Sequence, residues 1–193
     1  MPLAQSAHCP YLPVMIAKKR TRLSQNSWLD AGFTALCESG PTALKAEPLA
    51  RQLNTTKGSF YWHFTDLPAF HAALLERWEQ QALEAMSLSD SDATATQLRD
   101  FGQHLADPDT ARTDTAIRAW ALSLPAAADS VARVDCRRAE HLAGLLDQIG
   151  VSNPDMTSIL QAAAIGMQAM GPRPDLNQTR AMGSLVDLVL ALR

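Results

Sequence analysis

The sequence predicts an all-α protein built from an N-terminal three-helix domain and a C-terminal helical domain. Apolar residues recur at helical spacing along most of the chain, and clusters of Gly, Pro, Asp and Ser separate these runs. Charge divides the chain as well, because residues 15–65 carry a net charge of +4 whereas residues 66–193 carry −7. A basic N-terminal part joined to an acidic remainder is typical of two domains with different partners.

The overall composition excludes several classes of protein. The chain has 193 residues, of which 47% are hydrophobic and 19% charged, so it is not mostly disordered. Its net charge of −3 argues on its own against a nucleic-acid-binding protein, but that mean hides the basic segment. No apolar run approaches the roughly 18 residues that span a bilayer, so no membrane partner is expected. Cys9, Cys37 and Cys136 lie far apart, which favours reduced thiols in a cytoplasmic protein and predicts neither a metal site nor a cofactor.

The first helix is predicted to begin after Ser24, whose side chain can cap the free N–H groups of the first turn. Leu23 and Trp28 flank this cap at the spacing of a hydrophobic staple. Gly40 and the following proline end the helix.

Two shorter helices and a longer one follow. The second helix is expected from about Ala46 to Leu53, and the third, capped by Thr56, from Lys57 to His63. Phe60 and Phe64 fall on one face of the third helix and are predicted to anchor it in a core. The fourth helix begins after Asp66, and its inner stripe is Leu67, Phe70, Leu74 and Trp78.

The rest of the chain reads as a linker and five more helices. The stretch from Ser87 to Thr96 is rich in Ser and Asp, which is typical of a linker. The five helices are expected at about 96–106, 111–123, 125–149, 154–170 and 176–192. The sequence therefore predicts three parts: residues 1–20 as a leader ending in a basic arm, 21–81 as the helix-turn-helix domain, and 82–193 as the helical body.

Residues 44–64 are the candidate functional site. Two helices joined by a three-residue turn, with polar and aromatic residues on the outer side of the second, match the helix-turn-helix arrangement, whose second helix enters the DNA major groove. Lys57 can donate to guanine or to phosphate, and Ser59 can bond either kind of partner. Tyr61 and His63 can donate to phosphate oxygens.

Further contacts are expected from the start of the third helix and from the basic arm. Gly58 lets the helix start approach a backbone closely, and the N–H groups near Thr56 favour a phosphate. The arm can add phosphate or minor-groove contacts through Lys18, Lys19, Arg20 and Arg22. The alternative for the whole motif is an ordinary helical hairpin with a solvated basic face.

The stretch from Ala50 to Phe64, followed by Leu74 and Leu75, resembles the DNA-binding domain of the tetracycline-repressor (TetR) family. The resemblance covers about residues 21–81, and its most specific part is the run from Lys57 to Phe64. It implies an all-helical homodimeric transcriptional regulator, usually a repressor that a small ligand releases from its operator. Carried over by position, it implies DNA contacts at Lys57, Ser59, Tyr61, Trp62 and His63, and phosphate contacts at Thr42 and Lys45.

The chain departs from the family pattern at two positions. Asn54 stands where the family usually has Gly, but Asn tolerates a positive φ better than most residues, so the turn is expected to survive. Leu67 stands where the family often has Lys, which removes one expected phosphate contact.

The last two predicted helices are apolar on most sides and are therefore expected to be covered on most sides, most simply by a second copy of the chain. A monomer with two core helices is the alternative. A two-fold dimer would read half-sites roughly 34 Å apart, or a multiple of that distance. The predicted interface residues are Leu160, Ala163, Met167, Leu185, Leu188, Val189 and Leu192.

Large or polar residues on the middle helices are candidates for an effector pocket: Trp78, Phe101, His104, Trp120, His141 and Met167. Each alone is more often a core or surface residue, but together they suggest a small apolar effector. A ligand that prefers one placement of the fourth helix would change the separation of the two recognition helices.

Two other functions remain open. One is a helix-turn-helix regulator controlled by a protein partner or by dimerisation alone. The other is a small helical enzyme, against which the sequence offers no metal-binding HExxH, nucleophile elbow, phosphate loop or paired carboxylates, so no catalytic residue is assigned.

Overall fold

The computed structural model describes residues 23–87, 89, 91–171 and 175–191, and every secondary-structure element within these ranges is helical. In chain order the elements are α1 (Gln25–Ser39), η1 (Pro41–Ala43), α2 (Ala46–Gln52), α3 (Lys57–Tyr61), α4 (Leu67–Glu84), η2 (Ala85–Ser87), α5 (Thr94–Leu105), α6 (Pro108–Ala121), α7 (Pro125–Gln148), α8 (Asp155–Ala169) and α9 (Gln178–Ala191). The predicted leader and basic arm, with Arg20 and Arg22, and the predicted interface residue Leu192 lie outside the described residues.

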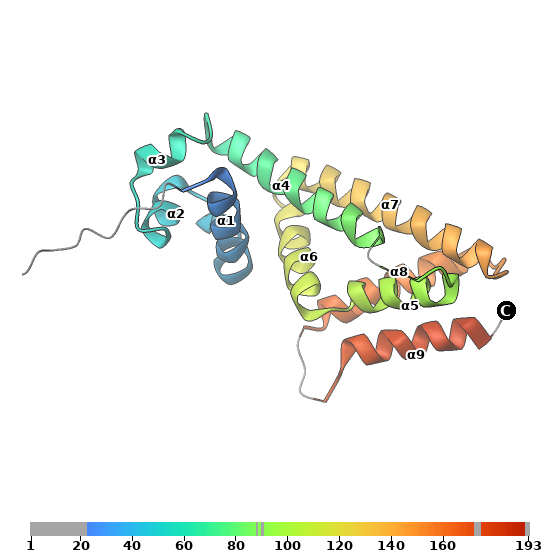
Figure 1. Cartoon of the computed structure of the whole chain (residues 1–193). Helices are drawn as coiled ribbons and strands as arrows, with labels where there is room; N and C mark the ends of the chain where they lie inside the picture. The colour runs from blue at the N-terminus through green and yellow to red at the C-terminus, as the bar shows by residue number, and fades with distance from the viewer. Residues whose placement is uncertain (1–22, 88, 90, 172–174, 192–193) are drawn as a thin grey trace, which may run out of the picture.

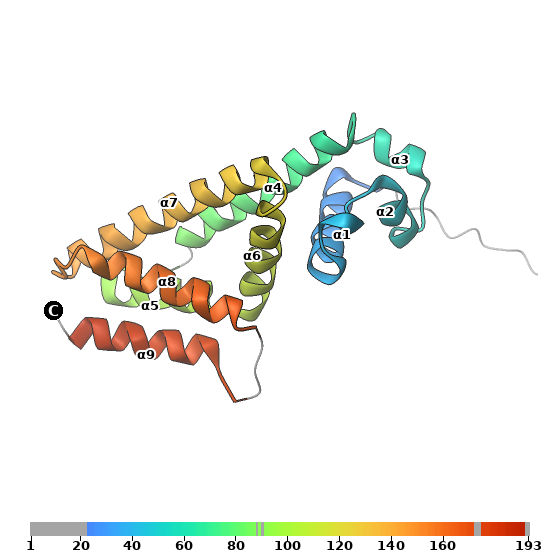
Figure 2. The ribbon, with the colours of Figure 1, turned by 180° about the vertical axis from the view of Figure 1, so that it is seen from behind.

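The helices form two parts joined by α4. Helices α1 to α3 make up one end of the molecule, which we call the head (residues 23–64), and α5 to α9 make up the other, which we call the body (residues 94–191) (Figure 1). Helix α4 runs from the head into the body, where it lies beside α7 (Figure 1). Seen from behind, α8 and α9 lie side by side along the edge of the body (Figure 2).

The helix ends follow from local chemistry and confirm most of the predicted boundaries. The Ser24 side chain caps α1 and completes a reciprocal capping box with Ser27, a partner that the sequence reading did not name. Gly40 ends α1 at a φ of 74°, and Asp66 caps α4 by accepting from the Ala69 N–H. These residues thus fix the start and the end of α1 and the start of α4.

Several predicted ends differ from the structure by two or three residues. Helix α5 begins at Thr94, within the predicted linker, and α6 begins at Pro108 rather than at residue 111. Helix α3 ends at Tyr61 rather than His63, because the Phe60 carbonyl accepts from both His63 and Phe64 N–H groups and the chain turns there. This turn brings the Phe64 ring back against Phe60, with 5.2 Å between the ring centroids. Helix α4 ends at Glu84 and continues only as the short 3-10 helix η2.

Aromatic rings form the core of the head. Trp28, Phe60 and Phe70 are fully buried, and the Phe60 ring lies 5.3 Å from each of the other two in edge-on geometry. Helix α1 crosses α4 at Gly32, where an added Cβ would lie 2.7 Å from the Phe70 ring. The close crossing of α1 and α4 therefore requires glycine at position 32.

The buried residues form two hydrophobic cores. The first core runs from the head along α4 to Trp120 of α6 and Val134 of α7. The head therefore shares one hydrophobic core with α6 and the first half of α7. The second core joins α5, the C-terminal half of α7, α8 and α9. Helix α5 packs closely on α9, because an added Cβ at Gly102 would lie 3.1 Å from Val186.

Candidate nucleic-acid interface

The turn between α2 and α3 keeps its shape without glycine. Asn54 adopts a left-handed φ of 51°, and the Thr55 N–H donates to the Ala50 carbonyl at 2.9 Å. Asparagine is one of the few residues that tolerate this backbone conformation. The structure confirms that the turn survives the exchange of Gly for Asn at this position.

Buried anchors determine which face of α3 points outward. Phe60 fixes the inner face in the aromatic core, and Phe64 follows it there. Lys57, Gly58, Tyr61 and Trp62 are exposed, while Ser59 and His63 are partly buried. Tyr61 and Trp62 are large rings at 46% and 79% exposure, a degree that soluble proteins rarely give to neighbouring aromatic residues without a binding role.

An open hollow of about 450 Å³ lies where α2, α3 and the start of α4 meet. It is lined by Lys45, Ala46, Glu47, Pro48, Arg51, Lys57, Tyr61 and Leu67, and we call it the basic hollow. Its one acidic residue, Glu47, forms an exposed ion pair with Arg51 at 3.4 Å. The Lys57 ammonium lies 5.9 Å from the centroid of the Tyr61 ring.

The predicted DNA contacts divide between the basic hollow and its surroundings. Lys45, Lys57 and Tyr61 line the hollow. Thr42 is exposed in the separate 3-10 helix η1, one turn before α2 rather than in it. Arg51 lines the hollow but was not predicted as a site residue, because only the crossing of α2 and α3 brings it beside Lys57.

Gly58 is not needed for the packing of the protein itself. A Cβ added to it would meet only the Thr56 hydroxyl oxygen, at the ordinary contact distance of 3.8 Å. Its φ is not in the positive range either. The fold itself would therefore accept alanine at position 58. Glycine at this position remains compatible with its predicted role, which is to let a nucleic-acid backbone approach closely.

The head contacts the body through α6 as well as through α4. The His71 ring on α4 lies with Nε2 3.3 Å from the Leu44 carbonyl, at the entry to α2, and packs edge-on against Trp120 of α6. Glu38 at the end of α1 forms an exposed ion pair with Arg112 of α6. A shift of α6 would therefore be transmitted to α1 and to the entry of α2.

The six predicted pocket residues do not come together in one place. Trp78 and Trp120 belong to the first core, whereas Phe101 belongs to the second and packs edge-on against His141 at 4.7 Å. Met167 is partly buried against the second core, and His104 is half-buried. A cavity of only about 10 Å³ in the second core is lined by other residues: Leu98, Gly102, Leu105, Leu142, Leu160, Met182 and Val186.

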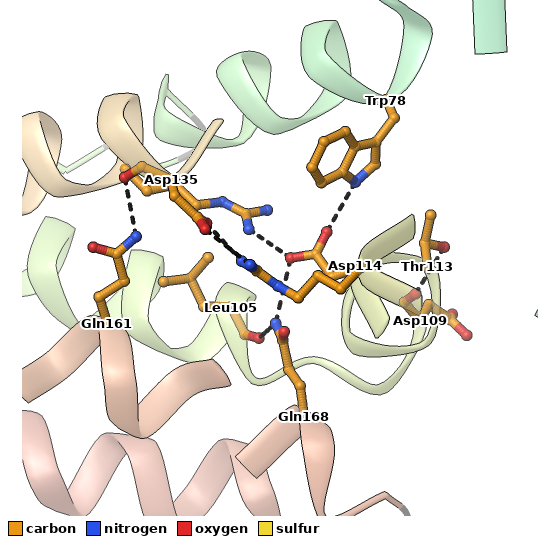
Figure 3. A network of polar contacts seen from close by, with 10 residues as sticks. Trp78, Leu105, Asp109, Thr113, Asp114, Asp135, Gln161 and Gln168 are labelled. Carbon is orange, nitrogen blue, oxygen red and sulfur yellow. Dashed lines mark hydrogen bonds and ion pairs between the residues drawn. The ribbon is translucent and has the colours of Figure 1, made fainter. Parts of the chain in front are cut away.

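A buried polar cluster in the body was missed by the sequence reading (Figure 3). The Asp114 carboxylate of α6 is 1% exposed and accepts from Trp78 Nε1 of α4 at 2.9 Å and from Arg138 Nη1 of α7 at 2.5 Å. Gln168 of α8 donates to the Leu105 carbonyl at 2.8 Å and approaches the same carboxylate at 3.4 Å. We call these five residues the Asp114 cluster. The available signal was the position of Asp114, one turn before the fully buried Ile117.

Neighbouring groups complete the electrostatics of this region (Figure 3). Arg118 donates to both oxygens of Asp135 at 2.8 and 2.5 Å. Burial, followed by the nearby positive charge of Arg138, lowers the pKa of His104 below its usual value. Burial alone lowers the pKa of His141. Both imidazoles are therefore neutral at pH 7.

The residues predicted to form a dimer interface differ in their exposure. Leu160 and Val189 are buried inside the chain itself, in the second core, so they belong to its interior. Ala163, Met167 and Leu185 are partly buried, and Leu188 is exposed. Exposed apolar or small residues lie near or on α8 (Ile159, Ala162, Gly166 and Met170) and on α9 (Leu188), and together with the partly buried Leu185 we call them the outer face.

These features define an all-helical protein with an N-terminal helix-turn-helix head on a helical body, and comparison with solved structures gives the particular fold. A transcriptional regulator from Rhodococcus sp. RHA1 is 18% identical and superimposes with a TM-score of 0.73 over 88% of this chain and 95% of its own. A TetR transcription regulator from Haloarcula marismortui gives 14% identity and a TM-score of 0.67 over 87% and 96%.

A third similar structure is a transcriptional regulator from Saccharomonospora viridis in complex with choline, with 15% identity and a TM-score of 0.66 over 86% and 95% of the two chains. The chain therefore has the TetR-like fold that its sequence predicts. No protein-family model matches the sequence, and no curated protein matches it.

Two further findings concern the described residues alone. None of the helices in this part of the chain is long and apolar enough to cross a membrane. Nor do three or more of the His, Cys, Asp and Glu residues described here gather as they would to hold a metal ion.

Proposed function

We propose that the protein is a transcriptional regulator that binds double-stranded DNA through α3 and the basic hollow. The observation that carries this proposal is the outward face of α3, where Lys57, Tyr61 and Trp62 stand exposed beside Lys45 and Arg51. Phosphate oxygens suit the cations of the hollow, while Lys57 and Ser59 at the start of α3 suit base edges in the major groove. The TetR-like fold of similar regulators supports the same reading.

Two copies of the chain are proposed to associate through the outer face. Ile159, Ala162, Gly166 and Met170 repeat at helical spacing near or on α8, and Leu185 and Leu188 continue the apolar surface on α9. Small residues at 162 and 166 allow the helices of a partner to approach closely. This pairing would present two copies of α3 to the two half-sites of a near-palindromic operator.

The regulator is proposed to act as a repressor that a small molecule releases from DNA. Helix α4 carries the head, and α6 touches both the head and the Asp114 cluster, so a ligand in the body has a physical route to the position of α3. The similar protein from Saccharomonospora viridis was solved with choline, which supports a small-molecule site in this fold. The cavity of only about 10 Å³ instead favours the second candidate, control by a protein partner.

DNA binding is tested with the DNA that flanks the gene of this protein. Fluorescence anisotropy at fixed salt would compare the wild type with Lys57→Ala and with Arg180→Ala, a control that removes an exposed cation at the start of α9, outside the head. Lys57→Ala is expected to cost about 1–3 kcal/mol of binding free energy, and Arg180→Ala almost none.

The way in which the loss of affinity depends on the DNA sequence shows which kind of contact Lys57 makes. A loss confined to one operator position would mark a base contact, and a uniform loss across sequences a phosphate contact. Equal affinities for the wild type and both variants would contradict the proposed interface.

A further inference from the structure

The Asp114 cluster joins all the helices that surround the middle of the body. Trp78 comes from α4, Asp114 from α6, Arg138 from α7 and Gln168 from α8, while Leu105 at the end of α5 contributes its carbonyl oxygen (Figure 3). The carboxylate, the guanidinium and the amide are each more than nine-tenths buried. A polar group placed here would contact both the helix that carries the head and the helices of the second core.

Two buried atoms of the cluster have no hydrogen-bond partner. Arg138 Nε is an unpaired donor and Gln168 Oε1 an unpaired acceptor, on side chains that are 4% and 5% exposed. Both side chains converge on the same Asp114 oxygen, Oδ2. Buried polar atoms are costly unless a partner satisfies them, so the cluster is complementary to a group that both accepts and donates a hydrogen bond.

The charged side chains of the cluster and its surroundings already have partners within the chain, including Asp107, which accepts from the Asp109 and Thr110 N–H groups at the start of α6. Asp114 is paired with Arg138, and Arg118 is paired with Asp135. His104, which also faces Arg138, Asp107 and Asp114, is neutral at pH 7. A cation or an anion entering this region would find these charges already paired or hydrogen-bonded, and burying an ion without a partner of its own is far more costly than burying a neutral polar group.

The apolar side of the same region can hold the rest of a ligand. Leu105 gives its carbonyl to the cluster and its side chain to the lining of the small cavity, which places the cavity directly beside the polar cluster. Met182 also lines this cavity, and methionine adapts its shape more readily than branched side chains. Because this cavity is only about 10 Å³, an entering apolar group would have to displace Met182 and its neighbours to make room.

We propose that the Asp114 cluster is the polar end of an effector site for a neutral, mostly apolar molecule carrying one hydroxyl or carboxamide group. That group accepts from Arg138 Nε and donates to Gln168 Oε1, and the apolar part occupies the second core beside Leu105 and Met182. The proposal presupposes the ligand-responsive regulator described above, and it excludes quaternary ammonium ions and carboxylates as effectors.

Three probes of one shape and different charge test the proposal. They are 3,3-dimethylbutan-1-ol, which is neutral, choline, which is its cationic counterpart, and 3,3-dimethylbutanoate, which is an anion. At equal concentration and pH 7, only the alcohol is expected to raise the melting temperature of the full chain. An equal or larger rise with choline or the carboxylate, or no rise with the alcohol, would overturn the proposal.

Two glutamines on the same helix provide a matched pair of variants. Gln168→Met removes the unpaired acceptor, and the alcohol should then no longer shift the melting temperature. Gln161→Met is the control, because Gln161 Nε2 donates to the Asp135 carbonyl outside the cluster, and this variant should respond like the wild type. A response retained in Gln168→Met would count against the site.

A second readout on the wild-type chain covers the case in which Gln168→Met fails to fold. The indole N–H resonance of Trp78, which donates to Asp114, should move with the alcohol and stay in place with choline. A Trp78 resonance that the alcohol leaves unmoved would overturn the proposal. Operator binding, measured in parallel without any probe, reports separately on the proposed regulator, so the two failures are distinguishable.

Discussion

Single residues of α3 separate the demands of folding from those of the proposed DNA binding. Phe60 is required by the aromatic core, whereas its neighbours Lys57, Gly58 and Tyr61 face solvent. The same short helix therefore carries residues whose loss should unfold the head and residues whose loss should leave it folded.

Gly58→Ala is the sharpest substitution at this scale. Alanine fits the space at position 58 and favours a helix by about 1 kcal/mol over glycine, so the melting temperature should stay unchanged or rise. Affinity for the operator should fall, because the added methyl group stands between α3 and the DNA. Thermal unfolding and fluorescence anisotropy on the same samples check both expectations, and undiminished DNA affinity would refute the close approach.

His104 gives the protein a pH-dependent stability. Burial and Arg138 lower its pKa in the folded state below the value of 6.5 that it has in the unfolded chain. As the pH falls below 6.5 the unfolded chain takes up a proton that the folded chain does not, so stability decreases until the folded pKa is reached. The melting temperature should fall less between pH 7 and pH 5.5 in His104→Asn than in the wild type, and parallel pH profiles would contradict this.

At the scale of elements, the position of the head depends on how α1 crosses α4. Gly32 allows this crossing because a Cβ there would collide with Phe70, which is itself held among Phe60 and Phe64. Arg77 of α4 adds an ion pair to Asp30 of α1 at 2.6 Å. The crossing is therefore tight in its core and supported at its exposed edge.

Gly32→Ala should lower the free energy of unfolding by about 1–3 kcal/mol, because the core cannot accept the extra methyl group without displacing the Phe70 ring. Gly144→Ala is the matched control, since a Cβ at that position on α7 meets nothing within 4 Å. Denaturant unfolding of both variants measures the difference. Equal free energies of unfolding for the two variants would show that the crossing of α1 and α4 can accept an added methyl group, and would contradict the prediction.

Local and long-range features of the helices differ in how far the sequence predicts them. Caps, staples and stop residues are local, so Ser24 and Gly40 marked both ends of α1 correctly, and Thr56 and Asp66 marked the starts of α3 and α4. The direction of buried side chains between distant helices is not local. The six pocket candidates were therefore chosen by residue type alone, and they do not meet in the structure. The Asp114 cluster was not predicted, because its residues come from five separate helices.

The difference between local and long-range features also explains why the sequence predicted the outward face of α3 but not the outward faces of α8 and α9. The face of α3 was predictable, because two phenylalanines four residues apart fix which side is inward. On α8 and α9, apolar residues occupy most sides, so periodicity did not separate Leu160 and Val189 of the core from Ile159 and Leu188 of the surface. Only the packing of α5 and α7 against these helices makes that distinction.

At the scale of the whole molecule, the account requires two copies of the chain. Leu188→Glu places a charge on the outer face, where Leu188 is 59% exposed, and should convert a dimer into a monomer in analytical ultracentrifugation. Leu122→Glu is the control, because Leu122 is 90% exposed at the connection between α6 and α7, away from α8 and α9. A Leu188→Glu protein that stays dimeric would place the interface elsewhere.

The distribution of charge over the whole molecule explains why the net charge alone argues wrongly against DNA as a partner. The chain as a whole has a net charge of −3, yet Lys45, Arg51 and Lys57 meet in one hollow on the head. The acidic remainder of the chain would repel a polyanion and so favour approach through the head. DNA affinity should accordingly fall with rising salt, since cations of the hollow displace counterions from the phosphates.

A footprint on the DNA that flanks the gene is the most direct test of the central claim, that paired copies of α3 read an operator. The account predicts two protected half-sites whose centres lie roughly 34 Å apart, or a multiple of that distance, with protection weakened by Lys57→Ala. A single protected site, or protection that covers the DNA evenly and ignores Lys57, would contradict it.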